Sequence, residues 1–366
     1  MNNHVTVLEI DAASVYHNLA YFKQKLNPKT KILAVVKAFG YGSEATEIAK
    51  TLQDKVDYFA VAYSNEGIIL RDAGIKTPIL VLHPQIKNLE DIVKYRLEPN
   101  LYNFKILEAF LLLADKKPLM NYPIHIKFNT GLNRLGFWHT DTPMLISQLK
   151  KSNNIKVESI FSHLAASEDA NEQDFTVGQI NNFAYIVKEI YQHLGYKPMI
   201  HILNTSGVIN YPQAQFDMVR IGIGLYGFGN NEHETSQLKN THTLKSIISQ
   251  IHLIQPGETV GYNRAFVANK LTRSATIPIG HADGISRKLG NKVGFVFINN
   301  QPAPIIGNVC MDMIMVDVTK IECKEGDEVI IFNHQKHIQY IAHKCETISY
   351  EILTAISQRV KRLVKS

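Results

Sequence analysis

Short apolar runs alternate with stretches of helical periodicity from Ile32 to Gly227. Apolar runs bounded by turn residues are typical of buried strands, and apolar residues three and four positions apart are typical of amphipathic helices. The runs begin near Lys31, Asp57, Thr77, Glu98, Tyr122, Ile155, Lys197 and Gln215. The helical stretches include Asn65–Ala73, Asn103–Ala114 and Asp174–His193. About eight strand–helix units predict an α/β fold, a closed (β/α)8 TIM-type barrel over residues 1–231, rather than an open doubly wound sheet.

In the last third of the chain the pattern changes to short strands separated by turn residues. The turns contain Pro-Gly, Gly-Asn, Asn-Asn and Glu-Gly pairs, which commonly link antiparallel strands. The strand candidates are Leu244–Gln255, Arg273–Ile279, Lys292–Asn299, Val309–Val318 and Glu328–Phe332. They predict a mostly antiparallel β domain over residues 232–366, with helices at His337–Cys345 and Ser349–Ile356. Residues 1–10, which include the strand candidate Val5–Ile10, are candidates for pairing with this second domain.

Composition excludes several classes of function. The 366 residues carry a formal charge of +6, and the lysines are scattered, so neither a nucleic-acid partner nor an unusual surface charge is indicated. No segment approaches the roughly 20 apolar residues of a membrane span, and the N-terminus lacks the pattern of a signal peptide. The odd number of cysteines, without metal-ligand spacing, indicates reduced thiols in a cytoplasmic protein with no metal site. The basic segment Arg359–Ser366 is interpreted as an edge strand or a solvated tail.

The candidate chemistry begins with a lysine at the end of a predicted strand. Lys37 follows the apolar run Lys31–Val36, and a glycine-containing turn with Tyr41 comes next. Ser43 then stands in a typical N-cap position before the helical stretch Glu44–Lys50. Desolvation lowers the pKa of a lysine and makes its amine a nucleophile or a base. A lysine whose amine simply reaches out to solvent is the alternative.

The segment Val35–Gly42, with the pattern Val-Val-Lys-Ala-x-x-Tyr-Gly, resembles the pyridoxal-phosphate lysine motif of alanine racemases. Seven further segments match the same family in the same order: Asn129–Gly136, Phe161–Ala165, His201–Thr205, Val219–Gly227, Val260–Arg264, Pro278–Gly284 and Cys310–Asp312. The resemblance runs from about Leu8 to Arg362. It implies a pyridoxal 5'-phosphate enzyme that interconverts L-alanine and D-alanine for peptidoglycan. It also implies a homodimer with shared active sites.

The resemblance assigns the cofactor-binding residues. Lys37 is expected to hold the cofactor covalently. The other expected contacts are Tyr41, His163, Asn204, Thr205, Arg220, Gly222 and Ile223. Tyr41 and Thr205 offer hydroxyls, and the amides at Gly222 and Ile223 lie at a strand-to-loop junction suited to an anion. Tight packing in the barrel is the alternative role for Gly222, and a structural hydrogen bond is the alternative for His163.

Arg220 distinguishes racemisation from other reactions of this cofactor. The resemblance implies that Arg220 faces the pyridine nitrogen of the cofactor. Arginine stays protonated over the working range of pH, so it cannot take a proton from the ring and the nitrogen stays neutral. A neutral pyridine is a weaker electron sink, which suits racemisation. An acidic residue in this place would favour a decarboxylase or an aminotransferase.

Racemisation needs a base on each face of the α-carbon. Lys37 is expected to serve one face, and Tyr262 resembles the base for the other, delivered in this family by the partner subunit. A tyrosine has a reference pKa of roughly 10, so nearby cations must lower it. Arg134 and Met311 resemble substrate-carboxylate contacts. The resemblance assigns supporting roles to Lys127, His201 and Asp312, with Lys127, a position that is often carbamylated, holding Arg134.

The chain departs from the family pattern at positions near the site. Asn129 replaces an aspartate, Phe39 an asparagine, His281 a tyrosine and Asn308 an arginine, whereas Gln358 is expected at a tyrosine position that reaches the phosphate. These departures suggest an altered entrance or substrate preference. An amino-acid racemase of broader specificity, a non-enzymatic barrel that binds the cofactor and a barrel without cofactor remain as alternatives.

Overall fold

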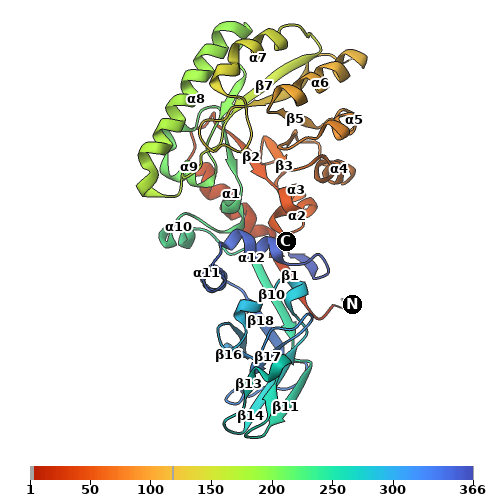
Figure 1. The fold of residues 1–366 in the computed structure, drawn as a ribbon, viewed down its shortest axis with the longest axis vertical. Coiled ribbons are helices and arrows are strands. Elements are labelled where there is room, and N and C mark those ends of the chain that lie inside the picture. Colours follow the sequence, from red (N-terminus) through yellow and green to blue (C-terminus); the bar gives the residue numbers. More distant parts are fainter. Residues whose placement is uncertain (1–3, 118, 366) are drawn as a thin grey trace.

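The computed structural model describes residues 4–117 and 119–365. Figure 1 shows a barrel with helices around it, joined to an elongated sheet domain that extends away from one end of the barrel. The helix α12 (Ser349–Ala355) lies at the junction of the two parts. The predicted combination of a TIM-type barrel and a mostly antiparallel β domain is confirmed.

Eight parallel strands form the barrel, in the order β8-β7-β6-β5-β4-β3-β2-β9. They are β2 (Lys31–Val35), β3 (Tyr58–Val61), β4 (Ile79–Val81), β5 (Glu98–Leu101), β6 (Tyr122–Lys127), β7 (Ile155–Phe161), β8 (Met199–His201) and β9 (Met218–Ile221). Backbone hydrogen bonds close the barrel between β8 and β9, from Asp217 N to Ile200 O at 3.1 Å and from Arg220 N to Leu203 O at 3.0 Å. Because helices cover the outside and side chains fill the inside, most of these strands are rich in apolar residues, as in β3 and β4, whose residues are all buried.

The helices predicted at Asn65–Ala73, Asn103–Ala114 and Asp174–His193 are present, and further helices lie between the other strands. The helices include α1 (Ala12–Gln24), α3 (Ala45–Leu52), α4 (Ser64–Asp72), α5 (Leu89–Lys94), α6 (Phe104–Lys116), α7 (Thr142–Leu149), α8 (Gln173–Leu194) and α9 (Thr205–Asn210). Side-chain caps fix several starts, as where Asn103 Oδ1 accepts the Ile106 N–H at 3.0 Å. The buried faces of these helices and the barrel interior form one continuous apolar core.

The second sheet has nine strands in the order β11-β14-β17-β16-β15-β18-β10-β1-β19. They are β1 (Val7–Asp11), β10 (His242–Ile247), β11 (Gln250–Ile254), β14 (Thr272–Ile277), β15 (Phe295–Ile298), β16 (Gln301–Ile306), β17 (Ile314–Asp317), β18 (Glu328–Phe332) and β19 (Lys361–Lys365). All neighbours pair antiparallel except β1 and β19, which are parallel. A short ribbon of β12 (Thr259–Val260) and β13 (Phe266–Val267) and the helices α10 (Glu232–Gln237) and α11 (Gln335–Lys344) complete the fold.

Two features of this sheet differ from the sequence prediction. The single segment predicted at Leu244–Gln255 is two strands, β10 and β11, with different neighbours in the sheet. The strand β16 was not predicted, because Pro302 and Pro304 argue against an interior strand. These prolines lie opposite Phe297 and Phe295 in the β15–β16 hairpin.

The turn that carries Lys37 has an unusual backbone. Lys37 begins α2 (Lys37–Tyr41), and the next four residues have positive φ, from 53° at Ala38 to 64° at Gly40. Glu44, with φ 86°, precedes α3, and Ser43 instead bonds His242 Nε2 through its Oγ at 2.6 Å. The prediction that Ser43 caps this helix is therefore wrong. Because left-handed residues are strained unless their surroundings fix them, this turn depends on its neighbours.

Gly42 is one point where the turn meets a neighbour. Its φ is 83°, and a Cβ there would overlap the backbone oxygen of Leu353 in α12. We expect Gly42→Ala to lower the free energy of unfolding by about 2 kcal/mol or more, from backbone strain plus overlap. The control is Gly74→Ala, since Gly74 has φ 88° but no atom within 4 Å of a Cβ. Chemical denaturation that finds the two variants equally stable would show that the contact with α12 is unimportant.

Candidate active site

A cavity of about 600 Å³ opens where the barrel strands end at their carboxyl sides. In a TIM barrel this is the end that carries the active site. Eight of the residues predicted from the sequence line it: Lys37, Tyr41, Lys127, Arg134, His163, Asn204, Arg220 and Gly222. The structure thus brings together side chains from five different strand ends and turns, as a site for one ligand requires.

Lys37 has the chemical character expected of a nucleophilic lysine. Burial lowers its pKa and the charge of Arg134 lowers it further, whereas Glu66 acts in the opposite direction. Glu66 also fixes the turn, because its carboxylate accepts the N–H groups of Ala38 and Ala62, each at 2.7 Å. The sequence analysis missed Glu66. The sequence does contain a signal for it, because Glu66 lies three residues after Tyr63, which is the spacing of a capping box at the start of α4.

The cavity gathers positive charge. Lys37, Lys127, Arg134 and Arg220 line it, and no aspartate or glutamate is among the described residues that do so. Burial, followed by the charges of Arg134, Arg220 and Lys37, lowers the pKa of Lys127 to about 7. A site of this kind favours ligands with phosphate or carboxylate groups.

Arg220 is buried and clamped by neutral acceptors. Its Nη1 donates to His201 Nδ1 at 2.6 Å, and its Nη2 donates to His163 Nδ1 at 3.0 Å and to the carbonyls of Ser162 and Ile202 at 2.8 and 2.9 Å. Burial and the charge of Arg134 lower the pKa of Arg220 to about 9, so the guanidinium is protonated at neutral pH. Burial and the charge of Arg220 lower the pKa of both histidines, which are therefore neutral.

Tyr41 and Gly222 form a cradle beside Lys37. A Cβ on Gly222 would lie 2.5 Å from Tyr41 Oη, so only glycine lets the hydroxyl approach this backbone. Thr205 Oγ1 accepts the Gly222 N–H at 3.1 Å, and Ile223 lines a neighbouring hollow with Thr205. Gly224, by contrast, packs closely against the ring of Phe22.

The neighbouring hollow, of about 580 Å³, shares Arg134, His163 and Asn204 with the cavity. Tyr350 lines both, and its ring centroid lies 6.0 Å from that of Tyr41. The expectation that Gln358 takes the tyrosine position near the phosphate is wrong.

Gln358 lines a separate surface hollow with Phe39 and Arg362. Tyr350 is the tyrosine that α12 presents to the cavity, eight residues before Gln358, and no motif of the sequence analysis includes it.

Asn129 organises the loop before Arg134. Its Oδ1 accepts the N–H groups of Gly131 and Asn133 at 3.2 and 2.9 Å, and its Nδ2 donates to Asn133 Oδ1 at 2.9 Å. Within residues 4–117 and 119–365, the Arg134 side chain makes no hydrogen bond or ion pair. The loop is therefore fixed while its guanidinium is left to meet a ligand.

Three predicted residues lie on the β domain and do not line the cavity. Tyr262 and Met311 are 70% and 58% exposed. Asp312 accepts a hydrogen bond from Arg359 Nη2 at 2.7 Å, and Asn308 Nδ2 donates to the Tyr262 carbonyl at 3.1 Å. One copy of the chain therefore does not bring Tyr262 and Lys37 into the same cavity.

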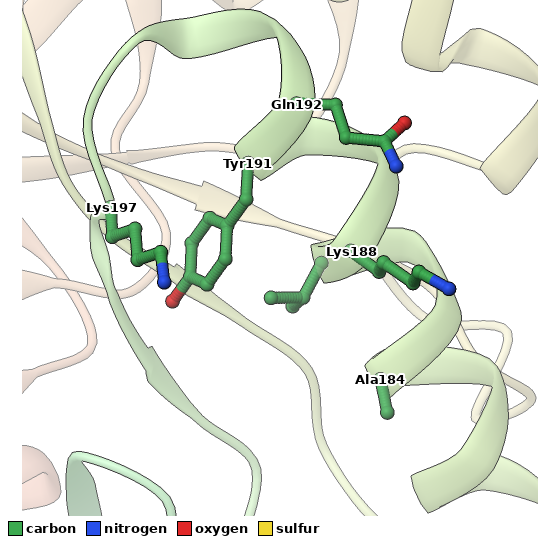
Figure 2. Close-up of a pocket in the computed structure, with 6 residues that line it drawn as sticks. Ala184, Lys188, Tyr191, Gln192 and Lys197 are labelled. Carbon is green, nitrogen blue, oxygen red and sulfur yellow. The ribbon is translucent and has the colours of Figure 1, made fainter.

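Figure 2 shows a different pocket, an open hollow on the outer face of α8. Its labelled residues include Tyr191 and Lys197, and the Lys197 amine lies 5.7 Å from the Tyr191 ring centre. No residue predicted for the site lines it. It is separate from the candidate active site.

Comparison with known proteins agrees with this geometry. A family model described as the N-terminal domain of alanine racemase matches residues 10–229, and a model of the C-terminal domain matches residues 241–364. The chain belongs to the alanine racemase family. The alanine racemase of Thermodesulfovibrio yellowstonii is 35% identical over 97% of this chain and 96% of that relative.

Solved structures of this family superpose over the whole chain. The alanine racemase of Clostridium difficile 630 has a TM-score of 0.94 and 32% identity, covering 100% of this chain and 97% of that one. The alanine racemase of Bartonella henselae, solved with covalently bound pyridoxal phosphate, has a TM-score of 0.89 and 30% identity, covering 99% of both chains. Family membership therefore rests on both domains, which does not favour a non-enzymatic single barrel.

None of the helices within residues 4–117 and 119–365 combines the length and the apolar character that a bilayer crossing requires.

The lowered pKa of Lys127 predicts how stability depends on pH. An unfolded lysine has a pKa of about 10.4, so between about pH 7 and pH 10 the unfolded chain binds more protons at this residue than the folded chain does. Stability should therefore rise with pH across this window. In cofactor-free, bicarbonate-free protein, Lys127→Met should make this rise in the free energy of unfolding smaller, as measured by urea denaturation, and the exposed Lys150→Met should leave it unchanged. A part of the rise should remain, because the pKa of Lys37 is lowered as well. Equal slopes in wild type and Lys127→Met would contradict the prediction.

Proposed function

We propose that this protein interconverts L-alanine and D-alanine with pyridoxal 5'-phosphate and two bases, Lys37 and Tyr262. We further propose that it acts as a cytoplasmic homodimer with shared active sites and supplies D-alanine for peptidoglycan. The observation that carries the proposal is the buried Arg220, clamped by two neutral histidines at a cavity without a carboxylate among its described lining residues. An anionic partner for the cofactor ring would favour other reactions.

The residues present fit the cofactor. Lys37 offers an amine with a lowered pKa, and the Tyr41–Gly222 cradle and Thr205 offer donors for a phosphate. When bound, pyridoxal phosphate supplies an electron-withdrawing ring that acidifies the α-hydrogen of an attached amino acid. Positive charge around the cavity compensates the phosphate and the substrate carboxylate.

Arg220 limits how far that acidification goes. It has hydrogen-bond donors only, and it keeps its proton at neutral pH, so it would donate to the nitrogen of a bound pyridine ring without giving that nitrogen a full positive charge. His163 and His201 hold the guanidinium in a single orientation. The result is a modest electron sink, which favours rapid return of the proton over side reactions.

Lys37 and Tyr262 exchange the α-proton on opposite faces of the substrate. Lys37, once its amine is free, takes or returns the proton on the side leading to D-alanine, and Tyr262 acts on the side leading to L-alanine. The 70% exposure of Tyr262 in one copy supports its delivery to the cavity of a partner copy. Such a partner would bury the exposed surface of Tyr262 and Met311 together.

Arg134 and Met311 bind the substrate carboxylate, the first through its guanidinium and the second through its backbone N–H. Lys127 supports Arg134 as a carbamate, since an amine with a pKa of about 7 is largely unprotonated just above neutrality and can react with carbon dioxide. The new negative charge would lie among the cavity cations. Asp312 positions the Met311 segment through its ion pair with Arg359.

The proposed reaction is tested by chiral product analysis of L- and D-alanine, serine and lysine. We expect alanine to be racemised in both directions and Lys37→Ala to lose nearly all turnover together with covalent attachment of the cofactor. After borohydride reduction, peptide mass spectrometry should find the cofactor on Lys37 in the wild type. A preference for another amino acid would support the alternative of a broader-specificity racemase.

Shared sites are tested by mixing two inactive variants, Lys37→Ala and Tyr262→Phe. Removing a group that transfers a proton typically costs about 10²–10⁴-fold, so each variant alone should be nearly inactive. A heterodimer with shared sites carries both lesions in one site and leaves the other intact, so activity should return on subunit exchange. If heterodimers form and no activity returns, each site is built within one chain.

A further inference from the structure

A chain of hydrogen bonds links the buried Arg220 to a glutamate deeper in the barrel. Arg220 Nη1 contacts His201 Nδ1 at 2.6 Å, and His201 Nε2 contacts Ser159 Oγ at 2.9 Å. Ser159 Oγ in turn contacts His125 Nδ1 at 2.6 Å, and His125 Nε2 contacts Glu98 Oε2 at 2.7 Å. Each atom named has a partner within normal hydrogen-bonding distance.

These residues come from adjacent barrel strands, β5 to β9, and their side chains point into the barrel. Their exposed fractions are 8% for Glu98, 0% for His125, Ser159 and His201, and 4% for Arg220. The interior of such a barrel is usually filled by apolar side chains. A buried polar chain is costly unless every member is satisfied, and it needs a reason for its place there.

The arginine end fixes the direction of the first two bonds. Arginine has no acceptor, so His201 Nδ1 accepts from Arg220. Neutral His201 then carries its proton on Nε2 and donates it to Ser159 Oγ. We take the same direction to continue, with the Ser159 hydroxyl donating its one proton to His125 Nδ1 and His125 donating from Nε2 to Glu98.

The glutamate end is compatible with the same direction. A carboxylate oxygen of Glu98 can accept from His125 Nε2, and Arg71 lies near Glu98, since the charge of Glu98 raises the pKa of Arg71 against its burial. Burial and the charge of Glu98 also raise the pKa of Tyr58, whose hydroxyl stays protonated beside the carboxylate. Reversing the chain would place an N–H of His201 against an N–H of Arg220 at 2.6 Å, which is repulsive.

We propose that Glu98, His125 and Ser159 are positioning residues that hold the ring of His201 in place from its far side and thereby hold Arg220 in its orientation toward the cofactor ring. The inference rests on the proposed function of Arg220. It adds residues that lie outside the cavity, and it explains why a carboxylate is buried beneath a site that has none at its surface.

The tautomers can be observed directly in the full-length holoenzyme labelled with [15N]histidine. We expect His201 to be neutral and both His201 and His125 to carry a proton on Nε2, with their signals assigned from His201→Asn and His125→Asn variants. In Ser159→Ala, His201 should keep its proton on Nε2, because Arg220 still requires an acceptor at Nδ1, but its Nε2 signal should shift because this N–H loses its hydrogen-bond partner. A wild-type His201 protonated on Nδ1 would overturn the proposal, as would a His201 signal unchanged in Ser159→Ala.

Kinetics give a second measurement. Ser159→Ala should lower kcat for alanine by about 10- to 100-fold, the range known for losing the hydrogen-bond partner of a metal-ligating histidine, with a much smaller change in KM. Glu98→Gln should lose less, because its amide oxygen can still accept from His125. The matched control is Glu189→Gln, since His139 Nε2 contacts Glu189 Oε2 at the same 2.7 Å but on the surface. It should change neither kcat nor the two tautomers.

The two measurements separate this proposal from the proposed function. If the wild type does not racemise alanine, the proposed function fails, and the histidine spectra still decide the direction of the chain. If racemisation is found and Ser159→Ala has wild-type kcat, the chain is a structural feature of the barrel and the positioning role is overturned.

Discussion

The site depends on keeping one guanidinium charged and fixed inside the barrel. An isolated buried cation is expensive, and Arg220 is stabilised by hydrogen bonds to histidine nitrogens and backbone carbonyls rather than by a carboxylate in contact with it. Because these partners are neutral, they do not cancel the positive charge of Arg220, which still acts on groups in the cavity. It also sets the protonation of the two histidines around it, because each must present a lone pair to the arginine.

The remaining cations extend this constraint to the whole cavity. Burial lowers the pKa of both Lys37 and Lys127, and the nearby cations, Arg134 above all, lower these pKa values further. The cavity is therefore strained electrostatically until anionic groups enter it. Reactivity of the Lys37 amine and affinity for a phosphate and a carboxylate arise from the same arrangement of charge.

Much of the fold followed from the sequence, because buried strands and amphipathic helices have different periods. The motifs also gave the residues that meet in the cavity. Local sequence patterns did not predict features that depend on contacts between residues far apart in the chain. The left-handed turn after Lys37 is fixed by Glu66 and by α12, so Ser43 was assigned wrongly as a cap. Tyr350 reaches the cavity from the β domain, and the partners of His125 depend on strand register, so periodicity could indicate neither.

The position of β1 links the two parts of the molecule. This strand is the first to be synthesised, yet it lies between β10 and β19 in the β domain, and α1, which follows it directly, packs on the barrel. The sheet therefore has a gap until residues from the far end of the sequence arrive. Although two family models divide the chain near residue 240, neither half contains all the strands of the sheet. The molecule has two domains, but they cannot form independently of each other. The chain enters the catalytic barrel from β1 and leaves it toward β10, and both strands belong to the same sheet.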